Sequence, residues 1–530
     1  MLKHLTMYFI LCAMYFTVLL LLACYGFHRS YLVFTCMQHR KELDKLKTAV
    51  SPLTLNELKD IHKCPMLTVQ LPLYNEATVA TRLLEYIARL EYPLERLEIQ
   101  VLDDSTDETR FLVSEQLKEM RKQGFNTIYL HRTNRIGYKA GALEAGLHIA
   151  KGELIAIFDA DFLPDPSFCR VLIPHFQDPK VGMVQARWGH LNRDFSLLTR
   201  VEALMLDGHH LVENRARVGA NWLFNFSGTG GIWRKEAIEN SGGWQHDTLT
   251  EDLDLSYRAQ LAGWKFIYRA DIVTPAELPE ELSTFRAQQY RWAKGTVQTA
   301  RKLLKRVMNS DLTRSQKVEA FFHLTPHFAY PLMMILSLLL LPALILMPAT
   351  NVTMMLLIDL PLCVGTTGSL MGFYMLAQTA QGRSASDAVR LLPALLAIGA
   401  GLAPHLSQGV LKGFQAQAGE FVRTPKKGGR SSRYQSRTEF PFLEAFLCLF
   451  SVGSTFASLE TKHWFATPFA LLFACGYGYV TCSIVGEQMS RRSSYLPQNP
   501  MLHPTASSQV PLANSLQTAN PTGSSQKLAI

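Results

Sequence analysis

LIAIFDAD, at residues 154–161, is the stretch of sequence that decides the fold. Its first five residues are apolar, which is typical of a strand covered on both faces, as in a parallel sheet. The strand ends at Asp159 and Asp161, which face the same way because alternate residues of an extended segment share a side. Ligands of open α/β sheets bind at the carboxyl ends of strands, so this pair lies where we expect a ligand.

Two carboxylates this close repel each other unless they share a cation or a proton. A Mg²⁺ or Mn²⁺ ion that also binds substrate phosphates would relieve this repulsion, so Asp159 and Asp161 are candidate metal ligands. A solvated turn after the strand is the alternative interpretation, because Asp-x-Asp is a common sequence.

Length and composition indicate a water-soluble domain joined to membrane spans. The chain has 530 residues and a net charge of +9, and it is too long for one ordinary core. Cytoplasmic loops explain the basic excess better than nucleic-acid binding, for which no basic helix or aromatic platform is present. The nine cysteines are scattered without a Cys-x-x-Cys pair, which argues against a zinc site or a disulfide framework.

Apolar stretches predict five membrane spans. Residues 7–27 can cross a bilayer, and basic residues follow them, which places the N-terminus outside and the chain beyond residue 40 in the cytoplasm. A signal peptide is the alternative, but no cleavage site with a polar mature start follows. The other expected spans are residues 328–347, 354–376, 440–459 and 465–485.

Residues 391–406 are apolar too, but a crossing there would put the basic loop 412–437 outside. We therefore expect this segment to lie along the interface or to re-enter, which its prolines and glycines permit. Residues 491–530 are rich in Ser, Thr, Pro, Asn and Gln and are expected to form a disordered tail.

Residues 64–275 alternate short apolar runs with helical patterns, as in a βα domain, and strands are expected at residues 66–73, 97–102, 127–130, 154–158 and 181–188. Tyr74 and Glu76 follow the first strand, and Asp103 and Asp104 end the second, so polar groups gather at one sheet edge. Lys139 lies in a glycine-containing segment that opens a helix, where anions bind well. An ordinary helix-initiating loop is the alternative for this segment.

Thr250 has the position of a helix N-cap, and Glu251 and Asp252 follow it in the first turn, where acids favour the helix dipole. The functional alternative makes Asp252 a general base for an acceptor hydroxyl. Within the amphipathic segment 280–300, Trp292 and its neighbours form either an interfacial anchor or a sugar-stacking face with a phosphate-binding guanidinium.

Two further segments lie between these motifs. Residues 197–214 are expected to form a helix that carries His209 and His210. Adjacent helical residues point in different directions, so we expect packing or hydrogen bonding from this pair rather than joint ligation. The glycine-rich segment 224–231 is either an ordinary turn or a stretch of open backbone that receives a sugar.

Together these motifs resemble the family 2 processive glycosyltransferases of the cellulose-synthase superfamily. The similarity is greatest to the cellulose-synthase-like A group, the plant glucomannan and mannan synthases, and to bacterial relatives. It implies an α/β GT-A-type (Rossmann-like) cytoplasmic glycosyltransferase domain plus an α-helical transmembrane domain, in the plasma (inner) membrane. The segments that carry the resemblance are VLDDSTDET from residue 101, GYKAGAL from 137, IAIFDADF from 155, VQARW from 184, TEDLDLSYRAQLAGWKF from 250, ELPEELSTF from 277 and QQYRW from 288.

The resemblance also implies roles for single residues. Asp252, Asp161 and Asp104 would be catalytic, and Asp159 and Asp161 would meet Mg²⁺ or Mn²⁺ and the diphosphate. The acceptor would be bound by Glu251, Gln288, Arg291 and Trp292. The donor would be bound by Tyr74, Glu76, Asp103, Asp104, Lys139, Arg291, Thr424 and Lys426.

Thr424 and Lys426 belong to a stretch, FVRTPK from residue 421, that resembles the gating loop F-x-V-T-x-K of cellulose synthases. Arg423 replaces the valine of that pattern. Ser227 stands where the plant group has asparagine. These two departures bear on loop behaviour and donor choice.

The activity that the resemblance implies is inverting polymerisation of a β-linked glycan from UDP-glucose or GDP-mannose, with passage of the polymer through the bilayer. Non-processive transfer to a lipid acceptor, and a silent membrane scaffold, are the alternatives. The sequence identifies no accessory or regulatory subunit. The expected segments are residues 1–30 (span), 60–310 (catalytic domain with interfacial helices), 323–378 (two spans), 386–438 (interfacial or re-entrant segment and gating-like loop), 439–486 (two spans) and 491–530 (tail).

Overall fold

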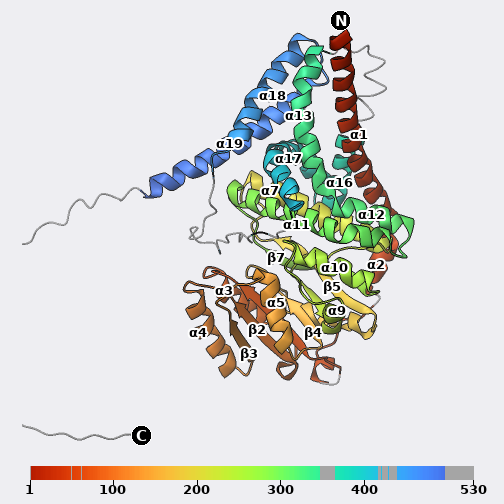
Figure 1. Ribbon diagram of the computed structural model, residues 1–530. Coiled ribbons are helices and arrows are strands. Elements are labelled where there is room, and N and C mark those ends of the chain that lie inside the picture. Colours follow the sequence, from red (N-terminus) through yellow and green to blue (C-terminus); the bar gives the residue numbers. More distant parts are fainter. Residues whose placement is uncertain are drawn as a thin grey trace, which may run out of the picture. The chain divides into compact units, whose positions relative to one another are not determined.

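The computed structural model describes residues 2–48, 50–60, 63–346, 364–415, 419, 428 and 439–495. It has two compact units, Met1–Glu487 and Gln488–Ile530, and the first contains the sheet and the site. Within the first unit, Figure 1 shows a sheet covered by helices and a separate group of long helices. The predicted gating-like loop lies outside the described residues except for Gly428, as does the predicted tail beyond residue 495.

A mixed seven-stranded sheet with the order β3-β2-β1-β4-β6-β5-β7 forms the centre of the first domain. β1 pairs in parallel with β2 and β4, and β2 pairs in parallel with β3. β6 runs antiparallel to both β4 and β5, whereas β5 and β7 are parallel. The strands are β1 Leu67–Leu73, β2 Leu97–Asp103, β3 Asn126–His131, β4 Leu154–Ile157, β5 Val181–His190, β6 Gly231–Arg234 and β7 Lys265–Ala276.

Five predicted strands are present, and the structure adds β6 and β7, which the sequence pattern did not indicate. β4 has one parallel and one antiparallel neighbour, so the sheet is mixed rather than wholly parallel. Leu73 aligns with Asp103, and Gln70 with Ile157, so β1, β2 and β4 end at the same edge. This register brings together the polar residues that follow the three strands.

Helices cover both faces of the sheet because its strands send apolar side chains alternately to each side. Val69 and Leu71 are fully buried in the core beneath α3 and α4, whereas Ile155 and Ile157 are buried in the core beneath α5. These covering helices are α3 Ala80–Ile87, α4 Thr109–Lys122, α5 Tyr138–Ile149, α9 Lys235–Asn240 and α10 Glu251–Leu261.

A layer of helices adjoins this domain on the side of the long apolar helices (Figure 1). A capping box starts α7, in which the Ser196 hydroxyl accepts from the Thr199 N–H and the Thr199 hydroxyl binds the Ser196 N–H. The next five residues form a π-helical turn. The elements of this layer are α7 Leu197–Gly208, the π-helix His209–Glu213, α8 Asn214–Gly219, α11 Leu282–Met308 and α12 Arg314–Leu324.

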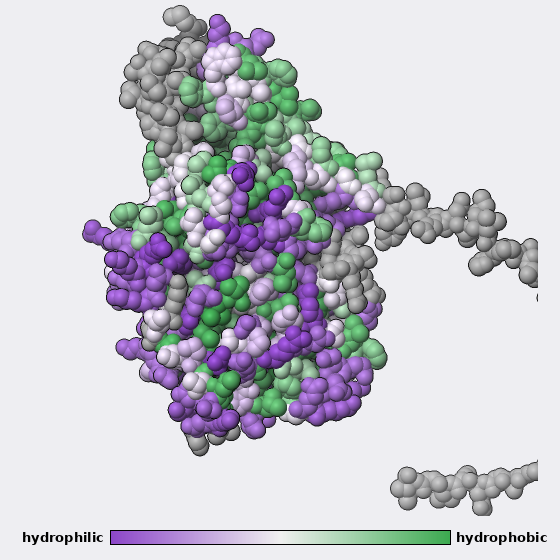
Figure 2. All heavy atoms as spheres, turned by 180° about the vertical axis from the view of Figure 1, so that it is seen from behind, coloured by the Kyte–Doolittle hydropathy of each residue, from purple (hydrophilic) through white to green (hydrophobic). Residues whose placement is uncertain are grey.

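Among the described residues, five helices are long and apolar enough to cross a membrane: Tyr8–Gln38, Pro326–Leu346, Ala385–Gly413, Phe442–Glu460 and Thr467–Arg491. They belong to α1 Leu2–Gln38, α13 Ala329–Leu346, α17 Ala385–Gly413, α18 Phe442–Glu460 and α19 Thr467–Tyr495. Figure 2 shows hydrophobic side chains gathered over the helical part and hydrophilic ones over much of the sheet domain. Long helices whose apolar side chains lie on the surface of the protein indicate a membrane protein.

Four of these helices coincide with predicted spans, and α17 does not. We expected an interfacial or re-entrant segment at residues 391–406, but α17 is one continuous helix that contains Pro393 and Pro404. A re-entrant turn there is therefore wrong, because neighbouring helices accommodate prolines inside an apolar helix. The predicted span 354–376 is described only from residue 364, where a π-turn leads into α16 Ser369–Thr379.

Candidate active site

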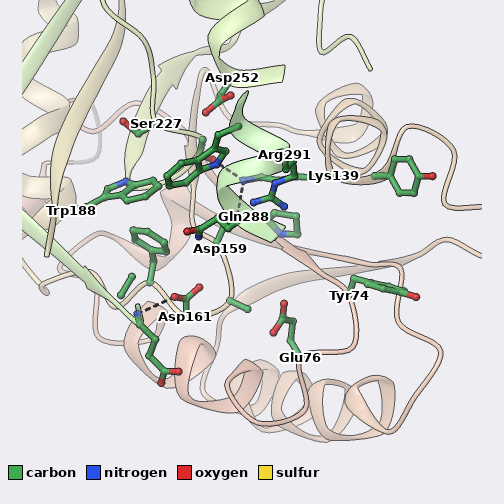
Figure 3. A pocket seen from close by; sticks show the side chains of 18 of the residues that line it. Tyr74, Glu76, Lys139, Asp159, Asp161, Trp188, Ser227, Asp252, Gln288 and Arg291 are labelled. Atoms are coloured by element: carbon green, nitrogen blue, oxygen red, sulfur yellow. Dashed lines mark hydrogen bonds and ion pairs between the residues drawn. The ribbon is translucent and has the colours of Figure 1, made fainter. Parts of the chain in front are cut away.

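A cavity of 210 Å³ lies at the shared carboxyl edge of β1, β2 and β4. Its wall is completed by the starts of α5 and α10 and by one turn of α11 (Figure 3). Segments that are far apart in the sequence thus meet around one space. The predicted site residues that line it are Tyr74, Glu76, Asp104, Lys139, Asp159, Asp161, Glu251, Asp252, Gln288, Arg291 and Trp292.

Asp103 is the one candidate among the described residues that does not line the cavity, because its carboxylate is hydrogen-bonded inside the sheet domain. It is fully buried, its Oδ2 accepts a hydrogen bond of 2.6 Å from the Tyr129 hydroxyl, and its Oδ1 accepts one of 2.8 Å from the Ser105 N–H. The prediction that Asp103 binds the donor is therefore not supported by its position. Thr424 and Lys426 lie outside the described residues, so their roles remain predictions.

Asp104 points to the cavity but is held by an arginine that the sequence analysis missed. Arg132 donates to both carboxylate oxygens of Asp104, at 2.8 and 2.6 Å, in a bidentate pair. The same guanidinium donates to the backbone carbonyls of Ile136 and Tyr138, at 3.1 and 2.9 Å. Asp104 and Arg132 therefore fix the loop that leads into α5.

An aromatic and cationic platform lies beside this pair. The Arg135 guanidinium lies 3.4 Å from the centroid of the Tyr74 ring, and 5.0 Å from that of Tyr138. Arg135 and Tyr138 have φ values of 45° and 49°, which non-glycine residues seldom adopt, and Gly137 lies between them at 72°. Backbone strain of this kind concentrates at functional sites, because surrounding structure has to maintain it.

Lys139 carries the positive charge at the centre of the cavity. Its Nζ forms an ion pair of 2.6 Å with Asp159 Oδ1 and donates to the Gly228 carbonyl at 2.9 Å. Burial lowers the pKa of the Lys139 amine, but the charges of Asp159 and Glu251 outweigh it and the pKa is raised. Lys139 is therefore protonated at neutral pH.

Asp161 lies deeper than Asp159, and its Oδ2 accepts a hydrogen bond of 3.0 Å from the Glu277 N–H. Within the described ranges, no group of three or more His, Cys, Asp or Glu side chains is arranged to hold a metal ion. Two carboxylates nevertheless suffice for Mg²⁺ when substrate phosphates and water complete its coordination. Asp159 and Asp161 fit a metal that arrives with a phosphorylated substrate, rather than a closed protein site.

Asp252 starts α10 on the opposite wall from the paired aspartates (Figure 3). Burial and the neighbouring charge of Glu251 raise the pKa of the Asp252 carboxyl to about 7, against the Leu253 N–H and Lys139, which lower it. Gly228 has a φ of +81°, and a Cβ there would lie 3.1 Å from Asp252 Oδ2. A carboxyl with a pKa near neutrality, in a cavity, has the properties of a general base.

Thr250 is the N-cap residue of α10, as predicted. Thr250 precedes α10 but makes no side-chain cap hydrogen bond. Its hydroxyl instead lies 3.0 Å from the Thr299 hydroxyl of α11. This contact ties the start of α10, and therefore Asp252, to α11.

The glycine-rich segment at residues 225–231 is shaped by Gln185, a fully buried side chain of β5. Its amide donates to the Thr229 and Gly230 carbonyls, at 3.0 and 3.1 Å, and its oxygen accepts from the Ser227 N–H at 3.0 Å. The Trp188 indole lines the cavity and donates to the Thr229 carbonyl at 3.4 Å. The VQARW motif thus builds the wall opposite Tyr74.

A second cavity, of 330 Å³, adjoins the first on the side of the apolar helices. Its lining includes Tyr25, His28 and Arg29 of α1 and Ala329 of α13. We call it the inner chamber. Seven residues line both cavities, so the two share a wall: Trp188, Leu206, Ser227, Thr250, Asp252, Gln288 and Trp292.

Several side chains in the wall of the inner chamber form close polar pairs. His28 lies 2.6 Å and Arg217 lies 2.9 Å from Glu319 of α12, which is not among the lining residues. Glu213 lies 3.0 Å from His209 and 3.5 Å from both Arg29 and Arg217. These pairs link α1 to α12 and to the π-helical turn.

Comparison with known proteins is consistent with this arrangement. Residues 65–295 match the family model described as "Glycosyltransferase like family 2". The chain is 39% identical over 297 residues to glucomannan 4-beta-mannosyltransferase 2 of Arabidopsis thaliana, an alignment that covers 54% of this chain and 56% of the relative. It is 36% identical over 314 residues to glucomannan 4-beta-mannosyltransferase 1 of Cyamopsis tetragonoloba, covering 58% and 60%. The chain therefore spans less than two thirds of the length of these relatives.

One similar solved structure is the mannosyltransferase PcManGT from Pyrobaculum calidifontis, in complex with GDP-Man and Mn²⁺. The TM-score is 0.46 and the sequence identity is 22%, and the match covers 68% of this chain and 98% of that one. The mixed sheet, its covering helices and the acidic edge define an α/β domain of the GT-A type, as predicted. Residues 65–295 of this domain carry the match to the glycosyltransferase family 2 model.

Proposed function

We propose that this chain is a membrane-embedded inverting glycosyltransferase that extends a β-linked mannan or glucomannan from a nucleotide sugar, with GDP-mannose as the first candidate donor and UDP-glucose as the second. One observation carries the proposal. A buried carboxyl whose pKa is raised to about 7, Asp252, shares a cavity with the Lys139–Asp159 pair and with Gln288, Arg291 and Trp292. The relatives that are glucomannan 4-beta-mannosyltransferases support the choice of sugar.

The donor would occupy the cavity along the edge of the sheet. Tyr74 and Arg135 offer a stacked face for the base, and Glu76 lies on the same side. Lys139 and Arg291 present cations to the diphosphate, where preorganised charge stabilises the leaving group. A divalent ion held by Asp159 and Asp161 would neutralise further charge on the diphosphate.

Asp252 would remove the proton from the acceptor hydroxyl. The acceptor oxygen then forms a bond to the anomeric carbon while the bond from that carbon to the diphosphate breaks. Attack opposite the leaving group converts an α-linked donor into a β-linked product. A base with a pKa near 7 is matched to this work, because about half of it is deprotonated at neutral pH and it takes up a proton readily.

The acceptor would enter from the inner chamber, which continues from Asp252 toward α1 and α13. Its lining includes Arg29, Arg217, Glu202 and Glu213 beside hydrogen-bonding and aromatic groups, so the wall has no large excess of either charge. This surface suits an uncharged glycan better than the phosphate of a lipid-linked acceptor. The chamber would also start the path along which a processive enzyme passes its product outward.

The full chain, purified in detergent, tests the proposal when it is incubated with labelled GDP-mannose, UDP-glucose and other nucleotide sugars, with Mn²⁺, Mg²⁺ or EDTA. We expect a β-linked polymer from GDP-mannose that depends on the divalent ion. Product length and extractability into organic solvent separate a polymer from a glycolipid. Absence of transfer from every donor, in protein that keeps its fold, would refute the proposal.

A further inference from the structure

His210 is a polar side chain of the inner chamber to which the mechanism above gives no role. It belongs to the π-helical turn His209–Glu213, a rare backbone form that is frequent at functional sites. His209 faces Glu213, at 3.0 Å, whereas His210 packs against Trp188 with 5.4 Å between the ring centroids. The turn therefore directs two adjacent histidines to different partners.

One nitrogen of the His210 ring is held and the other is not. The ring is 1% exposed, and its Nδ1 forms a hydrogen bond of 3.2 Å with the Tyr268 hydroxyl. Its Nε2 is buried without a hydrogen-bond partner among the described residues, although His210 lines the chamber. A buried polar atom without a partner is costly, so such an atom in a cavity wall calls for a ligand.

The charge state of His210 fits an uncharged ligand. Burial lowers the pKa of the ring well below its usual range, and the neighbouring His209, His190 and Arg187 act in the same direction. The imidazole is therefore neutral at physiological pH and offers Nε2 as a hydrogen-bonding atom rather than as a charge.

The surroundings of His210 are those of a sugar site. Ser227 lines both cavities, and its hydroxyl is also buried without a partner in the described part of the chain. Trp188 and Trp292 line both cavities as well, and aromatic faces beside a few fixed polar groups are typical of such pockets. The chamber's 330 Å³ lies within the range of about 300–1,000 Å³ for small-molecule sites.

We propose that His210 is a specificity-determining residue for the acceptor: its Nε2 hydrogen-bonds a hydroxyl of the glycan, and thereby holds the terminal sugar in register with Asp252. This inference rests on the proposed glycosyl transfer and goes beyond it, because it assigns acceptor recognition to the π-helical turn. Tyr268 is the positioning partner that fixes the ring through Nδ1.

Two variants of the full chain test the role of His210. His210→Phe keeps a planar ring without a polar atom, and His210→Gln restores one hydrogen-bonding group. With β-1,4-mannotetraose as acceptor, we expect His210→Phe to raise the acceptor KM about tenfold, the effect of one lost hydrogen bond to an otherwise unpaired group. The donor KM should change less than about twofold, and His210→Gln should recover part of the loss.

His175→Phe is the matched control, because His175 is also buried, 5% exposed, and hydrogen-bonded through Nε2 to Arg269 at 2.9 Å. It is absent from the described lining of both cavities. We expect lower thermal stability from this variant and an unchanged acceptor KM. An effect of His210→Phe that matched the control, or an unchanged acceptor KM, would overturn the proposal and leave His210 as a packing residue or the partner of a buried water.

Direct binding of β-1,4-mannotetraose to wild type and to both His210 variants, without donor, separates the two proposals. Weaker binding by His210→Phe with recovery by His210→Gln supports the role of His210, even if no donor is turned over. Equal binding by all three proteins refutes that role while transfer by the wild type still supports the proposed activity.

Discussion

At the residue scale, the position and pKa of Asp252 make a prediction about pH. Burial and Glu251 raise the pKa of its carboxyl from 3.8 to about 7, so the base is protonated below that pH and free above it. The wild-type transfer rate should rise about tenfold per pH unit below pH 7 and level off above it. Asp252→Asn should lower the rate by a factor of about 10²–10⁴ and abolish this rise.

The same raised pKa makes the free energy of unfolding depend on pH. Between pH 3.8 and about 7, the folded protein binds a proton at Asp252 that the unfolded chain releases. Raising the pH through this window therefore decreases the free energy of unfolding, and Asp252→Asn should remove that contribution. Initial rates and thermal midpoints across the window check both effects, and an unchanged pH profile in the variant would exclude Asp252 as the base.

Arg132 carries a second prediction at this scale. Arg132→Lys keeps the charge but loses the bidentate pair with Asp104 and the hydrogen bonds to the loop before α5. We expect the donor KM to rise roughly tenfold, because the loop that carries Arg135, and that leads into α5 just before Lys139, loses its anchor. Arg121→Lys is the control, since Arg121 is exposed and bonds only Thr127 among the interactions described. Similar donor KM values for the two variants would contradict this role.

Sequence reasoning predicted most of the site residues because their motifs follow strands or start helices. It could not tell which of Asp103 and Asp104 lines the cavity, because this depends on residues of and after β3. Tyr129 of β3 hydrogen-bonds Asp103, and Arg132 binds Asp104. Arg132 lies 28 residues beyond its partner, and no local pattern connects the two. Pairing across neighbouring strands, rather than residue type, decides such assignments.

At the element scale, the strands with continuous apolar runs could be predicted and the others could not. β6 has four residues next to a glycine-rich turn, and β7 mixes polar residues into its twelve, so neither has a clear period. At α17 only the re-entrant alternative fails, and the interfacial one stays a prediction. Its prolines and glycines indicate a break, but contacts with α11 and α19, which are distant in sequence, keep the helix continuous.

Those contacts predict the effect of a single methyl group in α17. An added Cβ at Gly401 would lie within contact of the Gly476 carbonyl of α19, too close for the two helices to keep their separation. Gly401→Ala should therefore decrease the free energy of unfolding by about 1–3 kcal/mol. Gly399→Ala is the matched control two residues away, because no atom lies within 4 Å of its added Cβ. Thermal midpoints in detergent measure both, and equal midpoints would contradict the close α17–α19 packing.

At the scale of the whole molecule, polar contacts join the sheet domain and its adjoining helices to the apolar helices. Asp207 of α7 pairs with Arg193, which follows β5, and accepts from Gln378 of α16 at 3.1 Å. Glu319 of α12 binds His28 of α1 at 2.6 Å. Removing one partner of a buried pair is strongly destabilising, so these contacts fix the position of the inner chamber relative to the cavity.

The orientation of the chain in the membrane can be tested by cysteine labelling. The positive-inside rule predicts a cytoplasmic sheet domain, and α18 would then lead outward to the short turn at Lys462 and His463 before α19 returns. A cysteine at His463 in a cysteine-free chain should react with a membrane-impermeant maleimide in intact cells. A cysteine at Asp178, on the exposed surface of the sheet domain, should react only after the membrane is permeabilised. The reverse pattern would put the candidate base on the side of the bilayer that lacks nucleotide sugars, and the proposed transfer would then have no donor.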